Sequence, residues 1–365
     1  MSPRSFATEL WQEFHTPQRL KPRALDEVET VLSVLLAILF AHVLHARNVG
    51  WAAFSGYIVM RSQLSITMTR GGLRLLGTAT GALTAWGVAL LMGQVLPLLS
   101  LTLGLVGGLT LYCALTRVRS YAWLLTGLTF SMVTLDGLTH PLEQVTDFAQ
   151  TRMLETSAGT LACLVVSLVS SWTLRPRLPP AEAAPAPRPA ASTAWNPGAA
   201  LHALQAAIAL AVVPWLARWL GDKELTQAAI TITALMMVPL SSLTTAQQLV
   251  STRVVHRFVG CMAGAIVATL ATLLCQGVLW ATLLCLVAGV VMGRHIENSG
   301  GRLAYVGNQF SLLFLVVFVP DSYQALSAEP GFARLQGVVI GIILLQVVRL
   351  AFAGVRRLRQ HAAAC

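Results

Sequence analysis

This sequence of 365 residues is poor in charge and nearly free of lysine. Charged residues occupy 11% of its positions, whereas a soluble domain has about 25%, and the only lysines are Lys21 and Lys223. Neither lysine ends a phosphate-binding GxxxxGKS or GxxxxGKT loop, and the chain has no HExxH, GxSxG or dinucleotide-binding fingerprint. These absences exclude ATP hydrolysis through such a loop, and we interpret the chain as a non-enzymatic protein without a cofactor.

The six cysteines form neither a metal-ligand pattern nor a disulfide framework. No two of them make a CxxC pair, and five lie within long apolar segments, where cysteine acts as a small hydrophobic side chain. The histidines are scattered singly, without the spacing of metal ligands. The sequence therefore predicts no metal site.

Long apolar segments dominate the chain. Apolar residues make up 55% of it, and segments of roughly 17–25 residues, enough to cross a hydrocarbon core of about 30 Å, recur with short breaks between them. The predicted fold class is an all-α polytopic membrane protein, with the lipid bilayer as its main partner. We expect twelve spans, at 28–46, 50–67, 72–93, 95–115, 120–138, 153–174, 201–219, 226–243, 255–275, 277–293, 303–320 and 335–353.

The net charge of +10 lies between the apolar segments and not on one clustered face, so it does not indicate nucleic-acid binding. The alternate connections are acidic or carry no excess of cations. Because cytosolic loops are enriched in Lys and Arg, this alternation places both termini in the cytosol. The basic residues follow every second expected span: Arg70 and Arg74, Arg117 and Arg119, Arg175 and Arg177, Arg253 and Arg257, Arg294 and Arg302, and Arg356, Arg357 and Arg359.

Two stretches, TRGGLRLLGTATGA (69–82) and TRVVHRFVGCMAGA (252–265), agree at six of fourteen positions. Their arginines are 183 residues apart (253 − 70), and Arg152 with Gly159 is echoed by Arg334 with Gly341 at an interval of 182 (334 − 152). We therefore expect two parallel six-helix repeats. The predicted organisation is a cytosolic tail that is either an amphipathic helix or frayed (1–24), the first repeat (25–175), a Pro/Ala-rich cytosolic linker (176–198), the second repeat (199–354) and a basic cytosolic tail (355–365).

The repeated arginines share one helix face with glycines, because their spacing follows the helical period. Glycine permits close approach of a neighbouring backbone, so this face is expected to point into the protein and not toward lipid. We place the arginines at the starts of the third and ninth spans, where helix N-termini also favour anions. The alternative is that they are ordinary interfacial cations. The residues in question are Arg70, Arg74, Gly77 and Gly81, then Arg253, Arg257, Gly260 and Gly264.

Arg61 and Glu155 are the other candidates. Arg61 lies about 16 Å along the second span if that span begins near Gly50, in the polar setting VMRSQLSITMTR. A cation near the midplane needs a wet cavity or a partner, which indicates a broken helix and a substrate or counter-ion site, unless Arg61 reaches the cytosolic face. Glu155 has the i,i+3 spacing of an ion pair with Arg152, and a proton relay is its alternative role.

Aromatic residues give a weaker signal. Most tryptophans, Trp51 among them, fall near span ends, which is typical of an interfacial belt. Tyr121 and Tyr305 lie within or at the start of spans, where they either pack or stack on a planar substrate.

A polar-ended second span followed by TRxxxRxxGxxxGA, in two six-span halves, resembles the fusaric acid resistance protein-like (FUSC) family, the integral membrane bound transporter domain proteins that include bacterial aromatic acid exporters. The resemblance implies proton-driven efflux of aromatic or other organic acids across a bacterial inner membrane. More distantly, the arginines are similar to those lining plant malate channels. Many family exporters have a large cytosolic domain between the halves, which this chain lacks, so a periplasmic adaptor or a second copy of the chain stays open as a partner. The alternatives to export are a passive organic-anion channel and a non-transporting scaffold.

Overall fold

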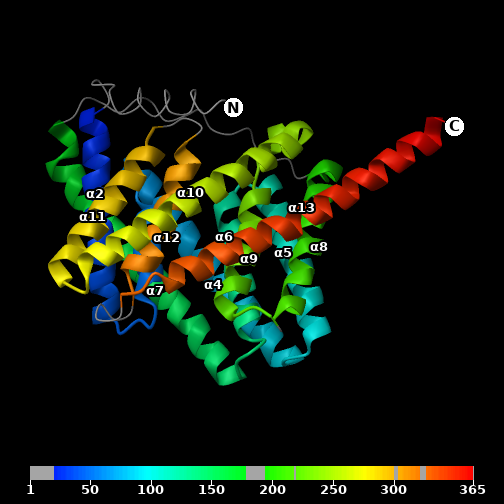
Figure 1. Cartoon of the computed structure of the whole chain (residues 1–365), viewed down its shortest axis with the longest axis horizontal. Helices are drawn as coiled ribbons and strands as arrows, with labels where there is room; N and C mark the ends of the chain where they lie inside the picture. The colour runs from blue at the N-terminus through cyan, green and yellow to red at the C-terminus, as the bar shows by residue number, and fades with distance from the viewer. Residues whose placement is uncertain (1–19, 178–193, 218, 300–302, 321–325, 365) are drawn as a thin grey trace.

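The computed structural model describes residues 20–177, 194–217, 219–299, 303–320 and 326–364, and every regular element in these ranges is helical (Figure 1). This confirms the expected all-α fold class. The helices are α2 (Leu20–Val43), α3 (Val49–Val59), α4 (Leu64–Met92), α5 (Leu96–Thr116), α6 (Ser120–Asp136), α7 (Leu142–Thr173), α8 (Pro197–Val212), α9 (Asp222–Met236), α10 (Ala246–Cys275), α11 (Leu279–Glu297), α12 (Ala304–Phe318) and α13 (Glu329–Ala364), with short 3-10 turns at Arg175–Arg177, Val213–Leu216 and Leu240–Thr245.

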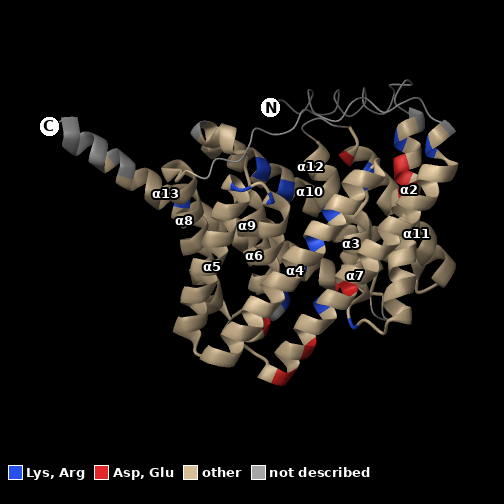
Figure 2. Cartoon of the chain, turned by 180° about the vertical axis from the view of Figure 1, so that it is seen from behind, with Lys and Arg blue, Asp and Glu red and all other residues tan. Residues whose placement is uncertain are grey.

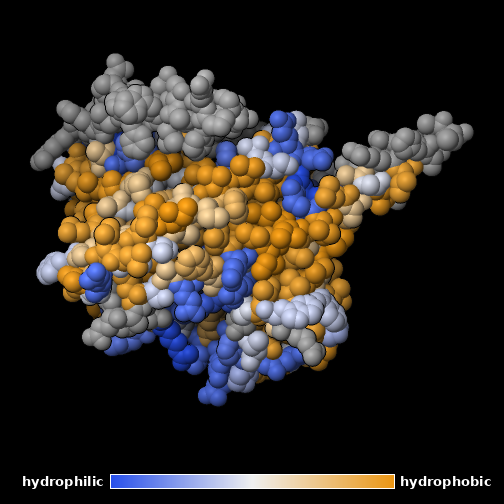
Figure 3. Space-filling model, in the orientation of Figure 1, coloured by the Kyte–Doolittle hydropathy of each residue, from blue (hydrophilic) through white to orange (hydrophobic). Residues whose placement is uncertain are grey.

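Each expected span overlaps at least one of these helices. Seven of the helices described are long and apolar enough to cross a membrane, namely α4, α5, α7, α8 with its following 3-10 turn, α10, α11 and α13. The helices α3 and α12 are apolar but shorter. Hydrophobic side chains form a band across the molecule, with hydrophilic residues along its lower edge and at its upper right (Figure 3). These features make the chain a multi-pass membrane protein.

Two helix breaks interrupt the apolar segments. The expected span 50–67 ends at Val59, and α4 begins at Leu64, well before the expected limit of 72. In the second half α9 ends at Met236, and α10 begins at Ala246 instead of 255. Polar residues mark the first break, and Pro239, which has no N–H to donate, lies in the second.

Side chains hydrogen-bond the carbonyl oxygens that these breaks release. At the first break, Nη2 of Arg294 donates to the carbonyl oxygen of Met60 at 3.1 Å. At the second, Arg253 donates through Nη1 to the carbonyl oxygen of Met237. Because an unpaired buried carbonyl is costly, these cations stabilise the non-helical backbone inside the bundle.

The helices pack in matching pairs within each half. In the first half α4 contacts α6, α3 contacts α7 and α5 contacts α6; in the second half α10 contacts α12, α9 contacts α13 and α11 contacts α12. Between the halves α5 contacts α8, α2 contacts α11, α6 contacts α9 and α3 contacts α12. The two halves therefore share an extended interface, and the site described below lies within it.

The ends of the expected domains differ from the structure in two places. Helix α2 begins at Leu20, inside the expected tail 1–24, and α13 runs to Ala364, so residues 355–364 continue a helix that projects beyond the bundle (Figure 1). The good helix formers of this segment, mainly Arg, Leu, Gln and Ala, favour that continuation. The expectations for residues 1–19 and for most of the linker 176–198 lie outside the described residues.

Candidate functional site: an arginine-lined cavity between the halves

A cavity of ≈ 310 Å³ lies between the two halves of the chain. Four helices of the first half (α3, α4, α6 and α7) and four of the second (α9, α10, α12 and α13) contribute to its wall. Its volume is at the lower end of the range for small-molecule sites. The side chains that line it include Trp51, Phe54, Arg74, Tyr121, Leu124, Leu125, Met132, Arg152, Ile230, Arg253, Arg257, Tyr305, Asn308, Gln309 and Arg334.

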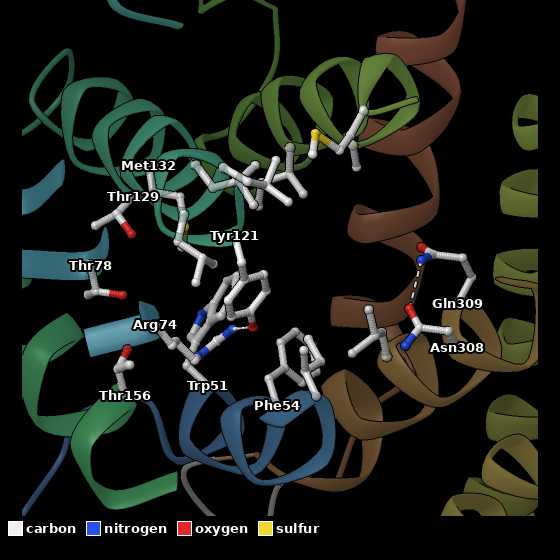
Figure 4. A pocket seen from close by; sticks show the side chains of 18 of the residues that line it. Trp51, Phe54, Arg74, Thr78, Tyr121, Thr129, Met132, Thr156, Asn308 and Gln309 are labelled. Atoms are coloured by element: carbon white, nitrogen blue, oxygen red, sulfur yellow. Dashed lines mark hydrogen bonds between the residues drawn. The ribbon is translucent and has the colours of Figure 1, made fainter. Parts of the chain in front are cut away.

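Arg74 is held by two hydroxyl groups on neighbouring helices. Its Nε donates to Oγ of Ser55 on α3 at 3.1 Å, and its Nη1 donates to the hydroxyl of Tyr121 on α6 at 3.3 Å. Figure 4 shows the guanidinium group beside the rings of Tyr121 and Trp51. These partners are uncharged, so they fix the position of the cation without neutralising it.

Arg257 has the same arrangement in the second half. Its Nε donates to Oγ1 of Thr231 on α9 at 3.2 Å, and its Nη1 donates to the hydroxyl of Tyr305 on α12 at 3.2 Å. The side chain is 2% exposed, and its Nη2 has no hydrogen-bond partner among the residues described. A buried cation in this state is electrostatically unsatisfied.

Arg152 on α7 forms the expected ion pair. Its Nη2 lies 2.6 Å from Oε2 of Glu155, and both side chains are buried. The other carboxylate oxygen of Glu155 accepts from the backbone N–H of Asn48 at 3.0 Å. The guanidinium group also stacks on Trp51, 4.5 Å from the ring centroid. Trp51 thus lies in the cavity wall, and its assignment to an interfacial belt is wrong.

Arg334 on α13 occupies the matching place in the second half but has no carboxylate partner among the residues described. Its Nη1 donates to Oε1 of Gln227 on α9 at 2.9 Å. It lies over the ring of Phe54 from the other half, 5.5 Å from the centroid. The side chain is 3% exposed, and its Nε makes no hydrogen bond within the described part of the chain.

Arg70 and Arg253 are the outer members of the repeated pairs. Arg70 lies over the ring of Tyr121, 4.6 Å from its centroid, but does not line the cavity. Arg253 lines the cavity and lies 5.8 Å from the ring centroid of Tyr305, while its Nη1 is engaged by the helix break described above.

The arginines do not lie at helix starts, contrary to the expectation. Because α4 begins at Leu64 and α10 at Ala246, Arg74 and Arg257 lie roughly 15 and 16 Å along their helices. The macrodipole acts within about the first turn, so it does not contribute to this site. The cations instead lie part-way along the bundle; Figure 2 shows Lys and Arg near α3, α4 and α7 away from the helix ends.

Arg61 does not line the cavity. It follows the end of α3 in the helix break that its polar neighbours predicted, and its Nη1 lies 3.5 Å from Oε1 of Glu297 on α11. Its side chain is 26% exposed. Arg61 is therefore the partner of an acidic residue, 236 positions later in the chain (297 − 61).

The repeated glycines lie where backbones approach closely. A Cβ on Gly77 would lie 2.5 Å from the carbonyl oxygen of Ala122, and one on Gly260 would lie 2.6 Å from that of Val306. Gly81 and Gly264 make equivalent contacts with α6 and α12. This contact brings Tyr121 and Tyr305 within reach of the arginines, as the close approach of small residues requires.

Sequence reasoning missed a buried charge cluster formed by α2, α3 and α11. Nε of Arg294 donates to Oδ2 of Asp26 at 2.7 Å, and its Nη1 lies 3.3 Å from Oε2 of Glu297. The hydroxyl of Tyr57 donates to the same Glu297 oxygen at 2.8 Å. In the sequence, Arg294 counted only as a loop cation, and no local pattern links it to α2.

The cavity wall also contains residues without a sequence prediction, among them Phe54, Asn308 and Gln309 (Figure 4). The adjacent amides inside the apolar segment 303–320 were the available signal, because polar side chains in a span mark functional positions. No Asp or Glu lines the cavity within the described part of the chain. Nor do three or more His, Cys, Asp or Glu side chains gather as a metal site in those residues.

The fold and this cavity define a polytopic helical membrane protein with an arginine-lined cavity between its halves. Residues 36–166 match the model of the family described as fusaric acid resistance protein-like. The match covers α4 with Arg70 and Arg74 and the part of α7 that carries Arg152, and it confirms the family resemblance that these arginines indicated. It agrees with a role in membrane transport in general. No curated protein and no solved structure matches the chain.

Proposed function

We propose that this protein exports organic acids, aromatic acids above all, across a bacterial inner membrane, and that the cavity between the halves is the substrate site. The observation that carries the proposal is the charge of the cavity wall. Arg74, Arg257 and Arg334 are buried, are anchored by neutral groups, and meet no carboxylate in the described wall. Burying an uncompensated cation is costly, so an anion that enters the cavity is stabilised because it supplies the counter-ion that these arginines lack.

The rest of the wall fits an aromatic body. Trp51, Phe54 and Tyr121 surround the anchored Arg74 (Figure 4), and Met132 adds a side chain that adapts to irregular shapes. Aromatic faces stack on planar rings. A wall of this composition favours an aromatic carboxylate over a small, strongly hydrated anion.

The proposed topology is twelve spans in two parallel six-helix repeats, with both termini in the cytosol. Three features support it. The contacts within the halves match pair for pair, the contacts between the halves exchange α2 with α8 and α5 with α11, and the anchors of Arg74 and Arg257 correspond. The alternation of basic and acidic connections gives the orientation. In this topology Arg70, Arg74, Arg253 and Arg257 attract substrate from the cytosolic side, and Arg152 and Arg334 line its path.

We propose proton coupling through Glu155. This carboxylate is buried and pairs with Arg152 in the cavity wall, so its protonation state sets the charge that the pair presents to the substrate site, and substrate binding and proton binding would be linked. The passive channel differs because it carries current down a voltage gradient without a proton requirement. Arg61, which lies outside the cavity, is proposed to keep the helix break near the path in place through Glu297.

The test is uptake of radiolabelled benzoate into liposomes that contain the purified protein and an imposed pH gradient. The variant Arg74→Gln/Arg257→Gln should abolish uptake while inserting normally, since glutamine can still bond the hydroxyl anchors. The loss should be roughly a hundredfold or more, because two uncompensated cations are removed from the cavity wall. Arg349→Gln is the control, since Arg349 bonds Gln346 and the backbone of Gln247 outside the cavity.

Three results would change the proposal. Uptake unchanged in the double variant would remove these arginines from the mechanism. Benzoate current that follows voltage and ignores the pH gradient would identify the channel. No uptake by the unaltered protein, for benzoate or for a panel of other organic acids, would favour the scaffold.

A further inference from the structure

The two halves of the cavity have the same framework of anchored arginines. Ser55 on α3 holds Arg74, and Trp51, one turn earlier on α3, stacks on Arg152. In the second half, the corresponding turns of α9 hold Arg257 through Thr231 and Arg334 through Gln227. Residues four apart lie on the same helix face about 6 Å from one another, so each half presents two neighbouring guanidinium groups.

The net charge of the two pairs differs. Glu155 balances Arg152 in the first half, but the position 182 residues later is Gly337 (337 − 155). A Cβ at Gly337 would lie 2.5 Å from the carbonyl oxygen of Glu224 on α9, so no acidic side chain fits there. The second pair, Arg257 and Arg334, therefore keeps its full double charge.

The side chains around the pairs differ in the same sense. Gly77 packs against Leu125 as Gly260 packs against Gln309, which sets the correspondence between α6 and α12 at 184 residues (309 − 125). Gly159 packs against Ser55 as Gly341 packs against Thr231, which sets α3 against α9 at 176 (231 − 55). With these intervals, apolar residues of the first half correspond to polar or smaller ones of the second: Trp51 to Gln227, Phe54 to Ile230, Leu124 to Asn308 and Leu125 to Gln309.

The cavity thus has an aromatic wall with one uncompensated cation, Arg74, in the first half and a polar wall with two, Arg257 and Arg334, in the second. Figure 4 shows the two sides, with Trp51, Phe54 and Tyr121 around Arg74, and Asn308 and Gln309 across from them. A molecule with two anionic ends would place its second charge against the aromatic wall, which has one uncompensated cation instead of two and would take that charge out of water among the rings of Trp51 and Phe54. A molecule with one anionic group and one apolar body matches both walls.

We infer that the substrate is a monoanionic, amphipathic aromatic acid that binds in a single orientation, with its carboxylate at Arg257 and Arg334 and its ring against Trp51 and Phe54. This inference rests on the proposed function and adds to it the class of substrate and its orientation. It also makes Arg334, Gln309 and Trp51 the residues that determine specificity. Although each half repeats the framework of anchored arginines, the cavity is expected to bind one substrate molecule.

The test measures binding of benzoate, acetate and terephthalate to the purified protein by isothermal titration calorimetry. Arg334→Gln removes one of the two cations at the carboxylate and should weaken benzoate and acetate alike, by about tenfold to a hundredfold. Arg152→Gln/Glu155→Gln removes a neutral pair from the apolar end, and its effect on benzoate should be several-fold smaller. Trp51→Leu should lower the preference for benzoate over acetate, because acetate has no ring.

The outcomes separate this inference from the function on which it rests. Benzoate binding one to one and tighter than terephthalate, with the losses ordered as above, supports it. Three results would overturn the orientation and leave export intact. The first is an equal loss of benzoate affinity in Arg334→Gln and in Arg152→Gln/Glu155→Gln. The others are tighter binding of terephthalate than of benzoate, and an unchanged preference for benzoate over acetate in Trp51→Leu. No binding of any of the three by the unaltered protein would overturn the proposed function as well. If Arg334→Gln fails to fold, Gln309→Leu takes its place, because leucine is the residue at the corresponding position 125. A loss of affinity of less than twofold for both benzoate and acetate in Gln309→Leu would also overturn the orientation.

Discussion

Replacing Asp26 with asparagine is expected to destabilise the protein by about 3 kcal/mol. Asp26 accepts two hydrogen bonds from Arg294, at 2.7 Å from Nε and 3.2 Å from Nη2, and both residues are buried. Removing one partner of a buried ion pair costs roughly 3–5 kcal/mol, because the remaining charge stays buried. The lower limit applies here, since Glu297 still lies 3.3 Å from Arg294 Nη1.

The matched variant is Asp26→Asn/Arg294→Gln, which removes both charges together. It should be less destabilised than Asp26→Asn alone, because neither charge is then left without its partner. Asp26 lies on α2 of the first half and Arg294 on α11 of the second, so the coupling between these positions measures a contact that joins the halves.

The assay is thermal unfolding of the detergent-purified protein, followed by the fraction that remains monodisperse in size-exclusion chromatography. Asp26→Asn should unfold several degrees below the unaltered protein, with the double variant in between. A double variant whose loss equals the summed losses of Asp26→Asn alone and Arg294→Gln alone would refute the reasoning, since additivity means that the two charges do not interact.

Two other predictions concern the site itself. Gly77→Ala should be strongly destabilising, since its Cβ would lie 2.5 Å from the carbonyl oxygen of Ala122. Gly72→Ala on the same helix has no atom within 4 Å of the new Cβ and should stabilise the protein by up to about 1 kcal/mol. Equal melting temperatures of the two variants would contradict the close helix contact. Arg61→Gln should reduce benzoate uptake far less than Arg257→Gln, because Arg61 faces Glu297 and not the cavity; equal losses in the uptake assay would place Arg61 in the path.

Hydropathy located each α-helix of the described residues, because burial in lipid requires long apolar segments whatever the tertiary packing. It placed the helix starts poorly. The apolar signal fades where polar residues such as Arg70 and Thr67 begin, yet backbone hydrogen bonding continues through them to Leu64. Limits set by hydrophobicity alone therefore start α4 and α10 too late, which is why Arg74 and Arg257 lie well inside these helices and not at their N-termini.

The site was accessible from the sequence only in part. Arg74 and Arg257 stood out because the pair Arg70 and Arg74 recurs in register as Arg253 and Arg257. Charged residues in apolar segments are energetically costly, so such a recurrence indicates a function. The anchors of these arginines did not stand out, since Ser55, Thr231 and the two tyrosines are ordinary residues of membrane helices. The Asp26–Arg294 pair joins residues 268 positions apart, and no periodicity encodes such a contact.

Comparison of Arg294 with Arg257 explains why a membrane protein retains so many buried cations. Arg294 is surrounded by two carboxylates and a carbonyl oxygen, so its charge is used within the fold and holds α2, α3 and α11 together. Arg257 has a threonine and a tyrosine as partners, which orient the guanidinium group but leave its charge uncompensated. Neutral anchors of this kind keep a cation both fixed and available, because the orientation is settled before the ligand arrives and the electrostatic gain is still to be made on binding.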